Sequence, residues 1–298
     1  MQSELRPLGS FEYYAPVSVA EVVNLLSVFG EESRLLAGGT DLLPQMRMGK
    51  QLPKVIIDLR KLGELRYVKE ESSLIRIGAC TTLTEVANTR CVQSRLPVLV
   101  EAINQLGCIE IRNRATIGGN LCNASPAADT APALLVLDAH VKLVGLEGER
   151  VVPLSEFFLG PGKTIMRRSE LMTEVIVPVK EKKGGFLKLG RRHGFTLSLI
   201  SVSASVQIQD GVFRDVRVAM GAIAPTPVRC QQVEAILEGE KVSEEVIERA
   251  ALAAKEEVNP SRETGKSREY RRATDDYRRE MAYVLVKRIL KKLTEVGI

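Results

Sequence analysis

Two short segments with paired glycines carry the clearest chemical signal in the sequence. In the first, an apolar run ends at Gly38 and Gly39, which are followed by Thr40 and Asp41. The second, at residues 116–120, again combines a hydroxyl, a glycine pair and a polar amide. Paired glycines allow positive φ and leave no Cβ in the way, so consecutive backbone N–H groups can converge on an anion.

The pairing of the two segments favours a nucleotide ligand. The first segment alone fits an ordinary tight turn with a helix cap at Thr40 or Asp41 equally well. A diphosphate carries charge on both of its phosphates, so two such loops clamping one ligand make physical sense. Neither segment matches the GxGxxG dinucleotide motif or the P-loop that ends in Gly-Lys-Ser/Thr. Both of those common phosphate cradles are therefore disfavoured.

Small residues at 123–128 follow the second segment and would let a flat ring approach the backbone. Asp129 could then accept a hydrogen bond from a ribityl or ring N–H group, or cap the next helix. Lys188 could stabilise negative charge that develops on a reduced ring. From the residues alone, we favour a surface lysine on an alternating strand. Residues 191–193 form a basic cluster that fits a solvated loop, a docking surface or a gate.

The sequence shows no catalytic triad, Cys-His pair or paired carboxylates, which suits a cofactor that performs its own chemistry. With five scattered cysteines and two histidines, a zinc or iron–sulfur site within the chain is not expected. The cysteines are interpreted as free thiols.

Length and composition predict a globular protein of two or three domains, because 298 residues exceed one ordinary core. The formal charge of +5 is mild and acids are mixed with the bases, so no nucleic-acid surface is expected. No apolar run approaches the ~20 residues that span a bilayer. The first ten residues lack the apolar core of a secretory signal. We therefore expect a cytoplasmic location.

Hydrophobic periodicity separates two regions along the chain. Up to about residue 178, strands and helices are mixed. Beyond it, three strands precede three helices, which is typical of a separate α+β domain. The expected strands are 34–37, 55–59, 65–69, 74–80, 141–144, 170–177, 186–191, 198–209 and 212–220, and the expected helices are 19–29, 96–106, 133–137, 231–237, 243–257 and 267–293.

The two glycine segments, with residues 123–132 after the second, resemble the paired FAD motifs of the molybdenum hydroxylase flavin subunits. That family includes the medium subunit of aerobic carbon monoxide dehydrogenase and the flavin domain of xanthine dehydrogenase. The resemblance runs almost end to end, from residue 11 to about residue 293.

The resemblance implies an α+β fold with a vanillyl-alcohol-oxidase (PCMH)-type FAD-binding domain of two subdomains, at residues 1–60 and 61–179. A C-terminal domain with a three-stranded antiparallel sheet and a helix bundle would occupy residues 180–298. FAD would be bound non-covalently, since neither loop contains a histidine. The cofactor-binding residues that the resemblance implies are Arg34, Leu35, Leu36, Ala37, Gly38, Gly39, Thr40, Asp41, Thr116, Ile117, Gly118, Gly119, Asn120, Asp129, Met172 and Lys188.

The same resemblance implies partners. A small subunit with two [2Fe–2S] clusters and a large molybdopterin subunit would join this chain in a dimer of heterotrimers. Electrons would pass from the clusters to FAD and on to an external acceptor. The cysteine-rich insertion of the 4-hydroxybenzoyl-CoA reductase flavin subunit is not found in this sequence.

Two alternatives are kept. A stand-alone flavin oxidoreductase of the same fold, such as a relative of the cell-wall enolpyruvyl reductase, would need a proton donor and a substrate pocket that we cannot assign. A nucleotide-binding assembly protein without a redox role would show no flavin colour after reconstitution with FAD.

Overall fold

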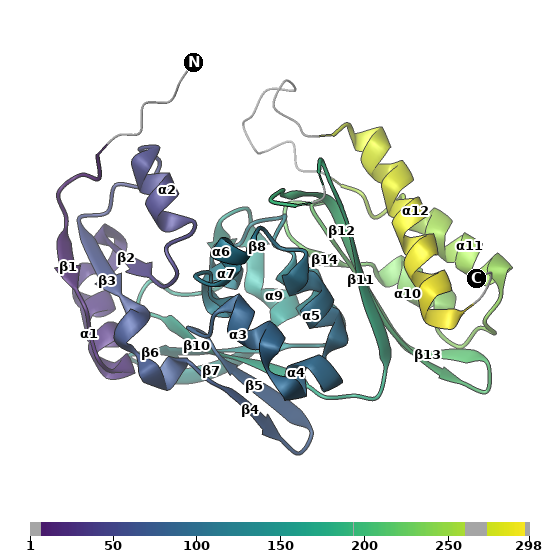
Figure 1. Ribbon diagram of the computed structural model, residues 1–298, viewed down its shortest axis with the longest axis horizontal. Helices are drawn as coiled ribbons and strands as arrows, with labels where there is room; N and C mark the ends of the chain where they lie inside the picture. The colour runs from purple at the N-terminus through teal and green to yellow at the C-terminus, as the bar shows by residue number, and fades with distance from the viewer. Residues whose placement is uncertain (1–6, 193, 260–272, 296–298) are drawn as a thin grey trace.

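The computed structural model describes residues 7–192, 194–259 and 273–295. Three main sheets follow one another along the chain, with helices packed on and between them (Figure 1). Part of the expected helix at 267–293 lies outside the described residues, as does His193 of the expected basic cluster.

The first sheet is parallel, with the strand order β1-β3-β2. Helix α1 begins where Ser18 Oγ accepts a hydrogen bond from Glu21 N at 3.2 Å, and it ends at Gly30, whose φ is +45°. Its apolar face packs on the sheet around Val22. The elements of this region are β1 (Glu12–Tyr14), α1 (Val19–Phe29), β2 (Ser33–Leu36), α2 (Leu42–Arg47) and β3 (Val55–Asp58), with the 3-10 helices η1 (Gly30–Glu32), η2 (Leu59–Lys61) and η3 (Gly63–Leu65).

The second sheet has five strands in the order β4-β5-β10-β6-β7, and its pairs are antiparallel. The central strand β10 is buried from Leu171 to Val177, because neighbours flank it on both sides. The strands are β4 (Val68–Glu71), β5 (Leu74–Gly78), β6 (His140–Gly145), β7 (Gly148–Pro153) and β10 (Leu171–Pro178).

Short helices share one apolar core with this second sheet. Helix α3 begins with a capping box, in which Thr82 and Glu85 satisfy each other's backbone N–H groups. A two-stranded ribbon, β8-β9, leads into β10. The elements are α3 (Leu83–Asn88), α4 (Arg90–Arg95), α5 (Pro97–Asn104), α6 (Ile109–Arg112), α7 (Ile117–Cys122), α8 (Thr130–Val136), α9 (Leu154–Phe157), β8 (Phe158–Gly160) and β9 (Lys163–Thr164).

The third sheet contains the three expected strands and a short fourth strand at its edge, in the order β11-β12-β13-β14. Asp210 and Gly211 both have positive φ, at 53° and 72°, and form the hairpin turn between β12 and β13. The elements are β11 (Lys183–Gly190), β12 (Ser198–Gln209), β13 (Val212–Gly221), β14 (Val228–Arg229), α10 (Gln231–Leu237), α11 (Glu244–Ala253) and α12 (Asp275–Thr294).

Strand β12 presents different chemistry on its two faces. Ile200 and Val202 join the apolar core under helices α10 to α12. On the opposite face Ser201, Ser203 and Ser205 are buried, and their hydroxyls have no hydrogen-bond partner among the described residues. Side chains alternate between the faces of a strand, so the serine face is turned toward α8 and α5, the other helices that contact β12.

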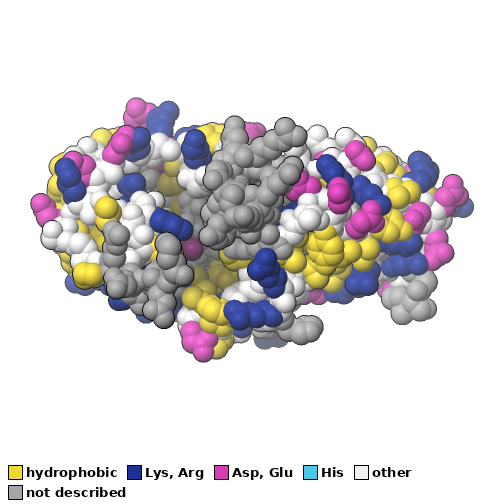
Figure 2. Space-filling view, turned by 90° about the horizontal axis from the view of Figure 1, so that it is seen from above, with side chains coloured by type: hydrophobic (Ala, Val, Ile, Leu, Met, Phe, Trp, Pro, Cys, Tyr) yellow, Lys and Arg dark blue, Asp and Glu magenta, His cyan; other side chains and the backbone are white. Residues whose placement is uncertain are grey.

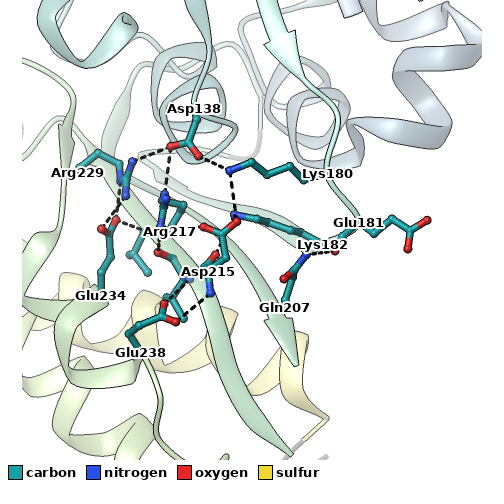
Figure 3. Close-up of polar contacts among 12 residues, drawn as sticks. Asp138, Lys180, Glu181, Lys182, Gln207, Asp215, Arg217, Arg229, Glu234 and Glu238 are labelled. Carbon is teal, nitrogen blue, oxygen red and sulfur yellow. Dashed lines mark hydrogen bonds and ion pairs between the residues drawn. The ribbon is translucent and has the colours of Figure 1, made fainter. Parts of the chain in front are cut away.

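An ion-pair network joins the second and third sheet regions (Figure 3). Its centre is Asp138, which follows α8 with a φ of +52°. Asp138 Oδ1 lies 3.1 Å from Arg217 Nε and 3.1 Å from Arg229 Nη1, while Lys180 Nζ donates to Oδ2 at 3.0 Å. Arg217 and Arg229 belong to β13 and β14, so one carboxylate ties the third sheet to the rest of the chain. The expected boundaries at residues 60 and 180 stay predictions.

Candidate functional site: a cavity between the first and second sheets

A cavity of about 700 Å³ lies between the first sheet and the wall formed by α7, β10 and the residues that follow β5. This size falls in the range of about 300–1,000 Å³ that is usual for small-molecule and cofactor sites. The first glycine segment lines one side, and the second segment lines the other. The structure therefore brings together two motifs that are far apart in the sequence.

The first glycine segment offers an open row of donors. Among the described residues, the backbone N–H groups of Gly38, Gly39, Thr40 and Asp41 donate to no protein acceptor. The segment follows the carboxyl end of β2 and leads into α2, and Gly39 has a φ of +77°. Four unpaired donors beside a cavity form a site that can bind an anionic group.

The two segments touch directly. A Cβ on Gly38 would lie 2.0 Å from the carbonyl oxygen of Arg114, so only glycine allows this approach. A Cβ on Gly119 would lie 3.8 Å from the Cβ of Ala37. Glycine at position 38 therefore sets the distance between the two walls of the cavity.

The second segment differs from the expected open loop. It forms the start of α7, and its N–H groups already have protein acceptors. Ile117 N donates to Thr81 O at 3.0 Å, and Gly118 N donates to Ala79 O at 2.9 Å. Gly119 N donates to the hydroxyl of Thr116 at 3.1 Å. The carbonyls of residues 79–81 and the Thr116 hydroxyl satisfy these donors, so this segment can reach a ligand mainly through side chains such as Asn120.

Most of the predicted binding residues line the cavity. The twelve that do are Arg34, Leu35, Ala37, Gly38, Gly39, Thr40, Asp41, Thr116, Gly118, Gly119, Asn120 and Met172. Leu36 and Ile117 do not, because their side chains are buried in the surrounding core. Asp129 and Lys188 also lie outside the lining.

Asp129 and Lys188 bind each other. Lys188 Nζ lies 2.6 Å from Asp129 Oδ2 and also donates to the carbonyl of Gln105 at 3.0 Å. Ser198 Oγ donates to the other carboxylate oxygen at 2.5 Å. The interpretation of Lys188 as a surface lysine is wrong, because distant segments cover it. Asp129 stands at the start of α8 but makes no capping hydrogen bond with its side chain.

Several lining residues carry no sequence signal. They lie at or after the ends of β5, α7 and β9 and just before β10, and they are Cys80, Cys122, Met166, Arg168 and Glu170. Only Cys122 lies close to a recognised motif. The others reach the site through the long-range pairing of β10 with β5 and β6, which no local pattern reveals.

Burial alters the titration of the lining groups. Burial raises the pKa of the Cys80 thiol to about 12, and it has the same effect on the pKa of Cys122. Cys122 Sγ lies 3.6 Å from the sulfur of Met166, so this part of the wall is apolar and polarisable. Desolvation also raises the pKa of Asp41, which opens onto the cavity yet has protein on several sides.

A scan against family models matches almost the whole described chain. Residues 9–180 match the FAD binding domain in molybdopterin dehydrogenase. Residues 186–293 match the CO dehydrogenase flavoprotein C-terminal domain. This chain belongs to the FAD-binding subunits of the molybdopterin dehydrogenases. Its cofactor is FAD, and the open donor row, the close approach at Gly38 and the size of the cavity fit that ligand.

Known proteins resemble this FAD-binding subunit over nearly their full length. The carbon monoxide dehydrogenase medium chain of Hydrogenophaga pseudoflava is 34% identical over 282 residues, which is 94% of this chain and 96% of the relative. The xanthine dehydrogenase FAD-binding subunit of Escherichia coli O157:H7 is 32% identical over 263 residues, covering 87% and 90%. These relatives are subunits of dehydrogenases, and the chain is an oxidoreductase subunit of the same kind.

Solved structures confirm the fold of the FAD-binding subunit. A carbon monoxide dehydrogenase structure from Hydrogenophaga pseudoflava aligns with a TM-score of 0.91 and 34% identity over 97% of this chain and 98% of that chain. Quinoline 2-oxidoreductase from Pseudomonas putida 86 aligns with a TM-score of 0.90 and 25% identity, over 97% and 99%.

Within the described residues, no three His, Cys, Asp or Glu side chains gather into a metal site. None of the described helices has the length and apolar character needed to cross a membrane. On the face shown in Figure 2, Lys and Arg side chains are mixed with Asp and Glu. The cytoplasmic location stays a prediction.

Proposed function

We propose that this chain is the FAD-binding electron-transfer subunit of a molybdenum hydroxylase complex. It would take electrons from the [2Fe–2S] clusters of a partner subunit and pass them to an external acceptor. The observation that carries the proposal is the cavity in which the open donor row of the first glycine segment faces the second segment. Bound FAD would supply the redox chemistry, and the protein would supply binding and orientation.

The first glycine segment would hold the diphosphate. Its four N–H groups, from Gly38 to Asp41, have no protein acceptor and would donate to phosphate oxygens. Thr40 could add its hydroxyl. The second segment would face the ribityl chain through Asn120, whose Oδ1 already accepts from Thr130 at 2.6 Å, leaving its amide N–H groups for the ligand.

Residues outside the lining would act indirectly. The resemblance implies that Asp129 and Lys188 lie at the flavin, and in this structure they hold each other in a buried pair. We propose that the pair fixes the protein wall behind the ring. Met172 lines the cavity from β10, where family resemblance also places a cofactor contact.

The proposed partners are a small subunit with two [2Fe–2S] clusters and a large molybdopterin subunit, in a dimer of heterotrimers. Relatives that are named medium chains or FAD-binding subunits support this assembly. A pull-down from the native source should bring along a cysteine-rich chain and a much larger one. A native chain that purifies alone and oxidises a substrate by itself would refute the subunit proposal.

The binding part of the proposal is tested by flavin content. Purified protein should show a flavin absorption band that is released on denaturation, and Gly39→Val combined with Gly119→Val should abolish it. Gly63→Val is the matched control, because no atom lies within 4 Å of a Cβ at that position. Stoichiometric FAD in the double variant would show that the loops are assigned wrongly.

A further inference from the structure

The side chains that line the cofactor cavity include more acids than cations, although the FAD diphosphate is anionic. Among the described lining residues the acids are Glu31, Asp41 and Glu170, and the cations are Arg34 and Arg168. Glu170 is neutralised from behind by Arg150, whose Nε donates to it at 2.7 Å. A diphosphate would therefore meet few cations that could pair with it.

Arg34 is already committed to other acceptors. Its Nε donates to Gln51 Oε1 at 3.0 Å. Its Nη1 donates to the backbone carbonyls of Glu31 at 2.8 Å and Ser33 at 2.7 Å. The guanidinium thus closes the turn before β2, and moving it to a ligand would break three hydrogen bonds.

Arg168 is held in a different way. It lies between β9 and β10 on one wall of the cavity, and it pairs with the carboxylate of Glu31 on the opposite wall. Both side chains are largely exposed, at 64% and 69%. An exposed ion pair contributes little to stability, so this contact can be exchanged easily. A phosphate also binds arginine more strongly than an exposed carboxylate does, because the guanidinium forms paired charge-assisted hydrogen bonds with it.

We propose that Arg168 leaves Glu31 and pairs with the diphosphate of FAD when the cofactor binds. Glu31 is then a placeholder, which keeps Arg168 extended across the cavity until the ligand arrives. The donor row at Gly38 to Asp41 would contact one side of the diphosphate and Arg168 the other. This inference rests on the proposed function, since it concerns the same cofactor site.

The neighbouring Arg167 provides a matched control. It is also exposed, at 58%, and it also pairs with an exposed glutamate, Glu147. Arg167 does not line the cavity. Arg167→Ala and Arg168→Ala therefore remove the same charge and the same kind of ion pair one residue apart.

The test measures FAD affinity of the deflavinated full chain, or of the complex that contains it, by quenching of flavin fluorescence. Arg168→Ala should weaken FAD binding by about 10- to 100-fold, as expected for a lost charge-assisted pair. Arg167→Ala should leave the affinity unchanged. Glu31→Gln should tighten binding by about 2- to 5-fold, because Arg168 no longer has a competing partner.

The double variant tests whether Glu31 affects FAD affinity only through Arg168. Adding Glu31→Gln to Arg168→Ala should produce no tightening. ADP, used as a competitor of FAD, should lose affinity in Arg168→Ala by the same factor as FAD. Equal affinities of Arg167→Ala and Arg168→Ala would overturn the inference, as would weaker binding in Glu31→Gln or unchanged ADP affinity. Wild-type protein that binds no FAD would instead refute the proposed function.

Discussion

Lys188 Nζ and Asp129 Oδ2 lie 2.6 Å apart with their side chains only 5% and 4% exposed. Burial raises the pKa of Asp129, and the charge and hydrogen bond of Lys188 offset this only in part. The pair joins β11 of the third sheet to the start of α8. It therefore couples the C-terminal region to the segment that follows the second glycine motif.

Removing one member of this pair should be strongly destabilising. Lys188→Met would leave the Asp129 carboxylate buried without its cation, which costs about 3–5 kcal/mol of unfolding free energy. Urea unfolding followed by circular dichroism would measure the change. Lys183→Met on the same strand is the control, because Lys183 is 54% exposed and pairs with an exposed glutamate. Equal losses in the two variants would show that the buried pair has no special role.

Gly38→Ala should separate the two walls of the cofactor cavity. The added Cβ would lie 2.0 Å from the carbonyl oxygen of Arg114, so the backbone must shift. We expect FAD affinity to fall at least about 100-fold, because the donor row would move relative to the opposite wall. Titration with FAD would measure the loss. Gly63→Ala, with open space around its Cβ, should bind FAD normally.

The ion-pair network around Asp138 should make the unfolding free energy depend on pH. Burial alone would raise the pKa of Asp138, but the hydrogen bond from Lys180 and the charge of Arg217 outweigh it and lower the pKa. The resulting stabilisation is complete above the unfolded-state pKa of about 3.9 and is lost as the pH falls through the lower folded-state pKa.

Asp138→Asn should therefore lower the unfolding free energy at pH 7 and reduce its further decline as the pH falls below about 3.9. Urea unfolding at a series of pH values would show both effects. Asp276→Asn is the control, because Asp276 is 94% exposed in an ion pair within α12. A variant with the same pH profile as wild type would contradict this account of the network.

Two serines of β12 lead to opposite expectations. Ser203 has a buried hydroxyl without a partner, so Ser203→Ala should be neutral or stabilising by up to about 1 kcal/mol. Ser198 donates to Asp129, so Ser198→Ala should destabilise by about 1.5–3 kcal/mol. Chemical denaturation of both variants would compare them. A destabilised Ser203→Ala variant would show that its hydroxyl is hydrogen-bonded in solution.

The glycine segments could be found from the sequence because their chemistry is local. A glycine pair after an apolar strand predicts a tight backbone turn wherever it occurs. Family resemblance then identified FAD, which the family models confirm. The capping residues Thr82 and Glu85 and the turn at Asp210 were predictable for the same reason, since each depends on residues a few positions apart.

The remaining parts of the site depend on contacts between distant segments. Lys188 lies on an alternating strand and looks exposed, but Asp129 and Gln105 cover it from other elements. Strand β10 was expected, yet its place between β5 and β6 was not, and this position sets the cavity wall at Met172. Likewise, the N–H groups of the second glycine segment are paired and those of the first are not, because only the second segment lies beside acceptors from residues 79–81.

This difference gives the two segments different parts in the cavity. The second segment is bound into the protein by its own backbone hydrogen bonds, so its shape needs no ligand. The first segment leaves four donors facing a cavity of about 700 Å³. The chain itself therefore fixes the second segment, whereas the four backbone donors of the first segment remain available to an anionic ligand.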